Sequence, residues 1–105
     1  ATVGVHEFGE PGRRRRVMTI NGNHQAGTDF PTTFTHRRIG HLPMLVHPDA
    51  RRALVIGLGG GATPGAVSVH DGVEVDVVEL ADAVVNGAKL FEEINYGVVH
   101  RPNVK

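Results

Sequence analysis

The stretch Leu54-Val-Ile-Gly-Leu-Gly-Gly-Gly-Ala-Thr-Pro-Gly-Ala66, followed by Val75-Asp-Val-Val-Glu79, decides the fold that we expect for this chain. An apolar run ends in a cluster of glycines, a helix-like segment follows, and a second apolar run ends in a carboxylate about 20 residues further on. This order is typical of the βαβ unit that begins a nucleotide- or nucleoside-binding domain. Glycines allow the backbone to approach a ligand closely, and Glu79 is placed to accept hydrogen bonds from ribose hydroxyls.

Composition limits the classes of protein to which the chain can belong. With 105 residues, of which 40% are hydrophobic and 21% charged, it has the size and make-up of one small globular domain or part of one. Its formal net charge of zero provides no general attraction to nucleic acid or to membranes, and we expect neither as a partner. The absence of cysteine excludes disulfides and thiolate metal sites, and favours a cytoplasmic location.

The N-terminal part of the chain predicts a small antiparallel sheet. Residues 2–8 alternate in polarity, as expected of a half-buried strand. Asn21-Gly22 is a strong signal for a two-residue hairpin turn, so we expect a strand that ends at Ile20 and a return strand over 23–26. Residues 28–33, which include a proline, are expected to form a loop.

Two helical patterns surround the glycine-rich stretch. The first carries an apolar stripe, and Pro43 is expected to kink or split that helix. The second is expected over 82–94, with Asp82 as its N-cap. The first stripe comprises Phe34, Ile39, Leu42, Leu45 and Val46, and the apolar face of the second helix comprises Val84, Val85, Ala88, Phe91 and Ile94.

The predicted fold class is therefore α/β, with a β-hairpin module followed by the first βαβα of a Rossmann-like parallel sheet. One βαβ unit cannot cover both faces of such a sheet, so we expect the chain to be part of a longer protein. The expected organisation is a hairpin module over 1–33, a connecting helix over 34–50 and the first half of a nucleoside-binding domain over 51–105.

The glycine loop by itself leaves the ligand open. Gly57-Leu-Gly-Gly-Gly-Ala62 satisfies the G-x-G-x-x-[GA] pattern, which enzymes that use nicotinamide and enzymes that use S-adenosylmethionine share. A pyrophosphate needs the N–H groups and the dipole of the following helix. A sulfonium nucleoside needs only close backbone approach and an acidic residue for the ribose. A tight turn without any ligand is the third alternative.

Sequence outside the loop favours one family. The segments Ile20-Asn-Gly-Asn-His-Gln25, His41-Leu-Pro-Met-Leu-Val-His-Pro48, Arg52-Ala-Leu-Val-Ile-Gly-Leu-Gly-Gly-Gly61 and Val77-Val-Glu79-Leu resemble the polyamine aminopropyltransferases, that is, spermidine synthases and their relatives. The resemblance implies a β-hairpin domain before a Rossmann-like domain of the methyltransferase type. It also implies transfer of an aminopropyl group from decarboxylated S-adenosylmethionine to a diamine such as putrescine, with methylthioadenosine as by-product, by a homodimer.

The resemblance also implies which residues bind the donor. Gln25 would touch the nucleoside, His41 would lie near the cofactor side of the cleft, and Glu79 would hold the ribose. The loop residues that would wrap the cofactor are Gly57, Gly59, Gly60 and Gly61. The catalytic base is expected beyond Lys105, so we expect the chain alone to be inactive.

Two departures from the family pattern concern the amine. Gly60 stands where the family commonly has an aspartate, and Thr35 where it often has a tyrosine. Both changes remove groups that are expected to handle an amine.

The alternatives that remain are an S-adenosylmethionine-dependent methyltransferase, a nicotinamide-dependent enzyme and a non-catalytic module that serves an interaction. The seven histidines show no metal-ligand spacing, so we expect no metal. The run Arg13–Arg16 is expected to be a solvated strand entry.

Overall fold

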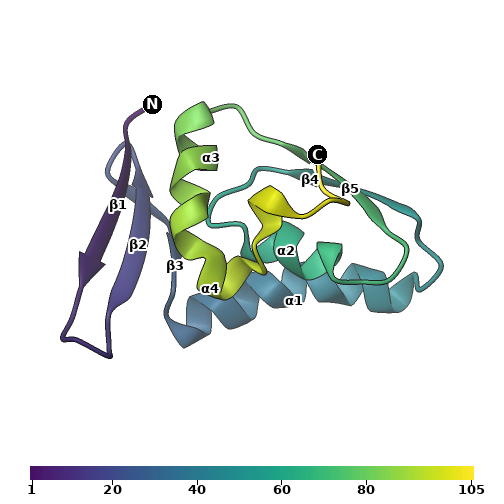
Figure 1. Cartoon of the computed structure of the whole chain (residues 1–105), viewed down its shortest axis with the longest axis horizontal. Coiled ribbons are helices and arrows are strands. Elements are labelled where there is room, and N and C mark those ends of the chain that lie inside the picture. Colours follow the sequence, from purple (N-terminus) through teal and green to yellow (C-terminus); the bar gives the residue numbers. More distant parts are fainter.

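Two small sheets organise the chain, one antiparallel and one parallel (Figure 1). The computed structural model describes all 105 residues. Its elements, in order, are β1 (Val3–Phe8), β2 (Arg15–Ile20), β3 (Asn23–Gly27), α1 (Phe30–Val46), β4 (Arg52–Ile56), α2 (Ala62–Ser68), β5 (Glu74–Val78), α3 (Asp82–Ala88), the 3-10 turn η1 (Lys89–Phe91), α4 (Glu92–Asn95) and the 3-10 turn η2 (Val98–His100). The predicted α/β class and the order of its two sheets are confirmed.

The N-terminal sheet has the strand order β1-β2-β3, with both pairs antiparallel. Asn21 and Gly22 form the turn between β2 and β3, and both have positive φ angles of 51° and 81°, as hairpin turns require. The register pairs Thr19 with His24 and Met18 with Ala26. Gln25 is consequently an extra residue in β3, which is the arrangement of a β-bulge.

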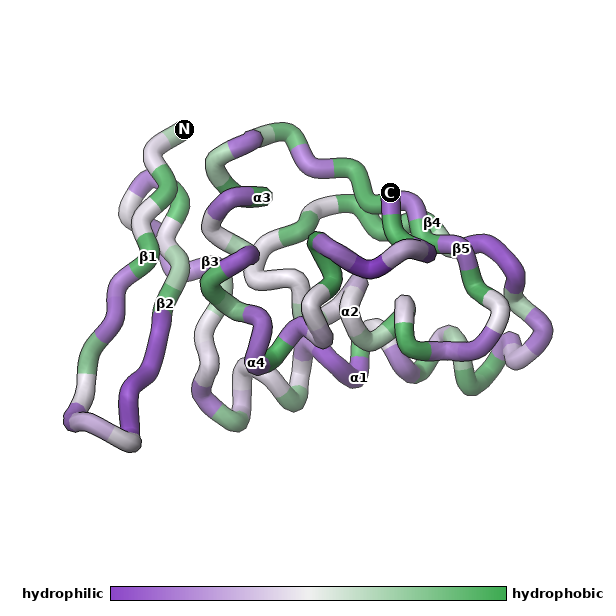
Figure 2. The backbone as a smooth tube through the Cα atoms, viewed as in Figure 1, coloured by the Kyte–Doolittle hydropathy of each residue, from purple (hydrophilic) through white to green (hydrophobic).

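The arginine-rich entry to β2 is hydrophilic and exposed, as Figure 2 shows for the strand that returns from the first turn. Glu7 on β1 forms ion pairs with both Arg14 and Arg16, at 2.5 and 3.0 Å. Arg16 also reaches Glu93, at 3.2 Å. These contacts support the predicted solvated strand entry and tie the hairpin to α4.

Helix α1 begins earlier than the sequence predicted. The carboxylate of Asp29 accepts a hydrogen bond from the Thr32 N–H at 3.0 Å and caps the helix. Pro31 lies in the first turn, where its missing N–H has no intrahelical partner to lose. The loop expected over 28–33 was therefore wrong from Phe30 onward. The connecting helix expected over 34–50 runs from Phe30 to Val46 instead. The sequence predicted that Pro43 would kink or split this helix. Pro43 lies inside a continuous α1, so the split was wrong.

The apolar stripe predicted to be the inner face of α1 is exposed. Ile39 is 56% exposed and Leu45 is 66% exposed, whereas Gly40 and Met44 are buried. The reason is the close approach of α2: a Cβ at Gly40 would lie 2.8 Å from the Ala66 Cβ. Small residues rather than the large apolar ones therefore form the contact between these two helices.

The second sheet contains β4 and β5, which pair in parallel. Val104 adds a parallel bridge to Val75 on the far side of β5. One face of this sheet packs against α1 and α2 through a cluster of Met44, Val67, Val73 and Val75. Because side chains alternate along a strand, the other face carries Leu54, Ile56 and Val78, which are exposed.

Helices α3 and α4 stand between the two sheets (Figure 1). The single helix expected over 82–94 is divided into α3, η1 and α4, and the N-cap is Ala81 rather than Asp82, which lies in the first turn. The predicted inner face is largely confirmed, since Val84, Ala88, Phe91 and Ile94 are buried. None of the helices combines the length and hydropathy needed to cross a membrane.

Candidate functional site

The glycine loop lies at the carboxyl ends of the parallel strands, between β4 and α2. Its residues Gly57, Gly59 and Gly61 have φ angles of 89°, 54° and 85°, which L side chains rarely adopt. The Gly57 N–H donates a hydrogen bond to the Val78 carbonyl at 2.8 Å. The turn is thereby joined to the end of β5, where ligands bind in open α/β sheets.

The four glycines named from the sequence differ in their surroundings. A Cβ at Gly57 or Gly59 would meet no atom within 4 Å, so these two leave the backbone open to a ligand. A Cβ at Gly60 would lie 2.8 Å from the Ala26 Cβ of β3. Gly60 is therefore required for packing between the loop and the N-terminal sheet. Gly61 is also buried, and it packs against Asn95 and Val98.

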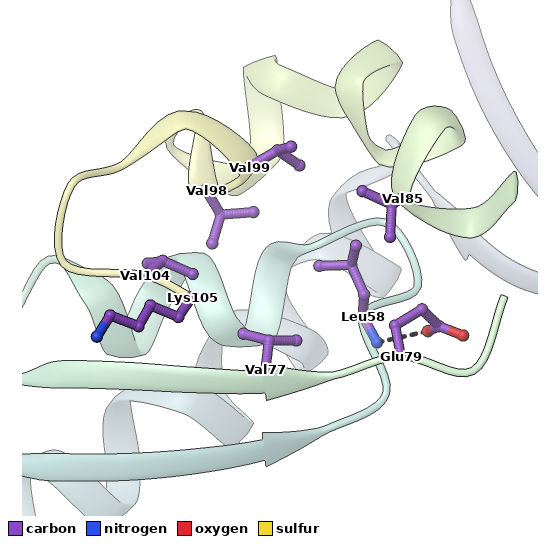
Figure 3. Close-up of a pocket in the computed structure, with 8 residues that line it drawn as sticks. All are labelled: Leu58, Val77, Glu79, Val85, Val98, Val99, Val104 and Lys105. Atoms are coloured by element: carbon purple, nitrogen blue, oxygen red, sulfur yellow. Dashed lines mark hydrogen bonds between the residues drawn. The ribbon is translucent and has the colours of Figure 1, made fainter. Parts of the chain in front are cut away.

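Glu79 lies directly beside this loop (Figure 3). One carboxylate oxygen accepts a hydrogen bond from the Leu58 N–H at 2.9 Å, and the other accepts one from the Ala81 N–H at 3.0 Å. Partial burial by itself raises the pKa of Glu79. Hydrogen bonds from backbone N–H groups, including those of Leu80 and Gly59, outweigh burial and place this pKa below its ordinary value. The carboxylate is therefore ionised near neutral pH and acts only as a hydrogen-bond acceptor.

An apolar pocket opens next to the carboxylate. Its volume is about 250 Å³, somewhat below the range of about 300–1,000 Å³ typical of small-molecule sites, so part of a larger ligand would extend beyond it. Figure 3 shows side chains from the glycine loop, β5, α3 and η2 around the same space. The lining residues are Leu58, Val77, Glu79, Val85, Val98, Val99, Val104 and Lys105.

Gln25 lies in a different hollow. This hollow has a volume of about 420 Å³, and its lining consists of His24, Gln25, Pro31, Thr32, Thr35 and His36. Gln25 is exposed at the bulge of β3, next in the chain to the Ala26 that packs against Gly60. Gln25 and Thr35 therefore share one polar surface, which contains no carboxylate.

His41 lines neither of these two pockets. Its Nδ1 lies 2.9 Å from the Nε2 of His70, and its ring meets the Tyr96 ring edge-on at 6.5 Å. Burial lowers the pKa of His41, and the charges of His70 and Arg37 lower it further. His41 is thus part of a small cluster between α1 and the segments after α2 and α4.

The structure therefore brings Glu79 to the open side of the glycine loop but leaves Gln25 and His41 outside the apolar pocket. The residues that fit a nucleoside are a carboxylate for ribose, open backbone at Gly57 and Gly59, and aliphatic walls. Sequence reasoning missed the wall that Val98 and Val99 of η2 form, because a pair of valines carries no motif. No group of three or more His, Asp or Glu side chains is placed to hold a metal ion.

Comparisons with known proteins agree on one family. Residues 32–104 match the model of the spermine/spermidine synthase domain. A polyamine aminopropyltransferase of Methanocaldococcus jannaschii is 44% identical over 90 residues, which cover 85% of this chain and 28% of that protein. Polyamine aminopropyltransferase 1 of Pseudomonas aeruginosa is 37% identical over 83 residues, which cover 78% of this chain and 29% of that protein.

Solved structures show the same fold. A crystal structure of spermidine synthase in complex with the transition-state analogue AdoDATO matches with a TM-score of 0.74 at 24% identity, covering 96% of this chain and 39% of that one. The spermidine synthase of Thermotoga maritima matches with a TM-score of 0.74 at 23% identity, covering 96% and 38%. The chain spans 28% and 29% of the two curated relatives named above.

Proposed function

Because this chain belongs to the spermine/spermidine synthase family, we propose that the protein that carries it is an aminopropyltransferase of polyamine biosynthesis. Its donor would be decarboxylated S-adenosylmethionine and its acceptor a diamine such as putrescine. Relatives named polyamine aminopropyltransferase support this function over methyl transfer, hydride transfer or a non-catalytic role. In this proposal the chain supplies the site for the donor's nucleoside.

The observation that carries the proposal is the position of Glu79. Backbone N–H groups of Leu58 and Ala81 hold its carboxylate between the glycine loop and the apolar pocket. An ionised carboxylate is a strong acceptor for ribose hydroxyls, and aliphatic walls suit a purine or a thioether. Gly57 and Gly59 would allow the backbone to border the ligand, because no side chain projects there.

The reaction needs little covalent help from the protein. Displacement at a carbon next to a sulfonium has a good leaving group, so the enzyme mainly holds the donor and the amine in line. The attacking amine must be neutral, which requires a general base. Glu79 is the only carboxylate in the pocket and serves the donor. We therefore assign the base to sequence that follows Lys105 and propose that the chain alone has no turnover.

The roles of Gln25 and His41 are part of the same proposal. Gln25 would approach the donor from the polar hollow beside Thr35, and His41 would act from α1 without lining the apolar pocket. The homodimer and the cytoplasmic location implied by the resemblance and the composition also remain proposals. Light scattering of the purified protein would measure the oligomeric state.

Calorimetric titration of the full-length protein with methylthioadenosine tests the site. We expect saturable binding, and we expect Glu79→Ala to weaken it about 10- to 150-fold, since a hydrogen bond to a charged group contributes about 1.5–3 kcal/mol. Glu79→Gln, which retains one acceptor oxygen, should lie between. Glu74→Ala, a change to an exposed carboxylate at the other end of β5, is the matched control and should bind normally.

The proposed site is refuted by two results together. The wild-type protein does not bind methylthioadenosine, and Glu79→Ala leaves the binding of every other adenosine-containing ligand unchanged. If methylthioadenosine binds but putrescine is not converted in the presence of decarboxylated S-adenosylmethionine, the nucleoside site stands and the aminopropyl transfer is refuted.

A further inference from the structure

Asn95 is a polar side chain with 0% exposure, and its amide forms three hydrogen bonds. Its Nδ2 donates to the Gly60 carbonyl at 3.0 Å and to the Ala88 carbonyl at 2.9 Å. Its Oδ1 accepts from the Gly97 N–H at 3.0 Å. A buried amide is costly unless it is hydrogen-bonded, and here both donors and the acceptor have partners.

Two of these partners, Gly60 and Gly97, adjoin opposite sides of the apolar pocket, and the third, Ala88, is the last residue of α3. Gly60 is in the glycine loop, two residues after Leu58, which lines the pocket. Gly97 leads directly into η2, whose Val98 and Val99 line it from the other side. Asn95 therefore connects the loop and the η2 wall through a single side chain.

Packing at Gly61 reinforces this connection. A Cβ at Gly61 would lie 2.8 Å from Val98 Cγ1 and 3.0 Å from Asn95 Nδ2. The loop, the amide and the wall are thus in direct contact, with no room for an intervening group. A shift of the amide would move both sides of the pocket relative to each other.

The turn that follows Asn95 is held in a strained form. Tyr96 has a φ of 60°, a left-handed conformation that costs a non-glycine residue about 1–2 kcal/mol. The bond from the Gly97 N–H to the Asn95 side chain spans this residue, and the Arg37 guanidinium lies 4.8 Å from the centre of its ring. Strain of this kind persists only when neighbouring contacts fix the backbone.

We propose that Asn95 is a positioning residue for the donor site, because it sets the separation between the glycine loop and the η2 wall. This inference rests on the proposed function, since the ligand is the nucleoside of the donor. Asn95 itself does not touch the pocket, so its effect on binding is exerted through Gly60 and Gly97.

Asn103 provides a matched comparison within the same chain. Its Nδ2 donates to the Ser68 and Val73 carbonyls, both at 2.9 Å. It is therefore also an amide that donates to two backbone carbonyls, but its partners lie outside the glycine loop and η2, the two segments that Asn95 connects. Removal of the Asn103 amide costs two hydrogen bonds and removal of the Asn95 amide costs three, but only removal of Asn95 releases the loop and the wall.

The test uses the full-length protein with Asn95→Ala, Asn95→Ser and Asn103→Ala. Melting temperature and the Kd for methylthioadenosine are measured for each, with titrations well below the lowest melting temperature. We expect all three variants to melt earlier than the wild type. We expect Asn95→Ala to weaken binding about tenfold or more, and we expect Asn95→Ser and Asn103→Ala each to weaken it less than Asn95→Ala does.

Equal Kd values for Asn95→Ala and the wild type would overturn the inference, as would equal weakening by Asn103→Ala. Hydrogen exchange of the wild type gives a readout that needs no variant. Methylthioadenosine should slow exchange of the Leu58 and Gly97 amides, and no slowing at Gly97 would also overturn it. If the wild type does not bind methylthioadenosine at all, the proposed function fails and this inference falls with it.

Discussion

Replacement of Gly59 by alanine tests whether the open side of the loop is a binding surface. Gly59 has a φ of 54°, and a Cβ there would meet no atom within 4 Å. The only cost to folding is therefore the left-handed backbone, about 1–2 kcal/mol for a non-glycine residue. Alanine also restricts the unfolded chain, which returns about 0.4–1 kcal/mol. We expect Gly59→Ala to lower the free energy of unfolding by about 1 kcal/mol.

Gly72 is the control for this change. Its φ is 74°, and a Cβ there would also meet nothing within 4 Å, but it lies in the turn before β5 and away from the pocket. Gly72→Ala should therefore cost the same free energy, measured by urea denaturation. Its Kd for methylthioadenosine should equal that of the wild type.

The two variants should differ in binding alone. The new methyl group at Gly59 would project into open space beside the loop, where we propose that the nucleoside lies. Crowding of a filled site by one methyl group typically costs about 1–3 kcal/mol, which corresponds to about a 5- to 150-fold weaker Kd. If Gly59→Ala binds methylthioadenosine as tightly as Gly72→Ala does, the ligand does not lie against this loop and our reasoning about the site is refuted.

Two further changes test the contacts of α1. Gly40→Ala should destabilise the protein by about 1–3 kcal/mol in urea denaturation, because the new Cβ would overlap the Thr63 carbonyl oxygen; a gain of about 1 kcal/mol, as helix propensity alone predicts, would contradict the packing. Asp29→Ala should cost about 0.5–2 kcal/mol through loss of the cap. The hydrogen bond from the Thr32 N–H lowers the pKa of Asp29 below its ordinary 3.8, so this difference from the wild type should be complete above that pH and vanish as the pH falls through the lowered value. A difference that persists in stronger acid would show that the carboxylate is not the cap.

Local signals in the sequence were sufficient for the hairpin and for the βαβ unit. Asn21-Gly22 specifies its turn through the positive φ that both residues adopt. The glycine cluster and Glu79 define the carboxyl ends of β4 and β5 because strands, turn and acid are close in sequence. Features of this kind depend on a few adjacent residues and little on the rest of the fold.

Features that depend on distant contacts were predicted less well. Pro31 signals a loop and a first helical turn equally, and the Asp29 cap decides between them. The exposed stripe of α1 could not be recognised as such, because Gly40 and Ala66 reveal their contact only in three dimensions. For the same reason the sequence did not indicate that Gln25 lies in a polar hollow separate from the apolar pocket beside Glu79.

The face of the parallel sheet that carries Leu54, Ile56 and Val78 has a practical consequence. These side chains are 63%, 82% and 50% exposed, and β4 has no partner along its outer edge. Strand edges with unpaired backbone groups, next to exposed apolar surface, promote self-association. A sample containing only these 105 residues should precipitate or form soluble aggregates, so size-exclusion chromatography ought to precede any titration of such a sample.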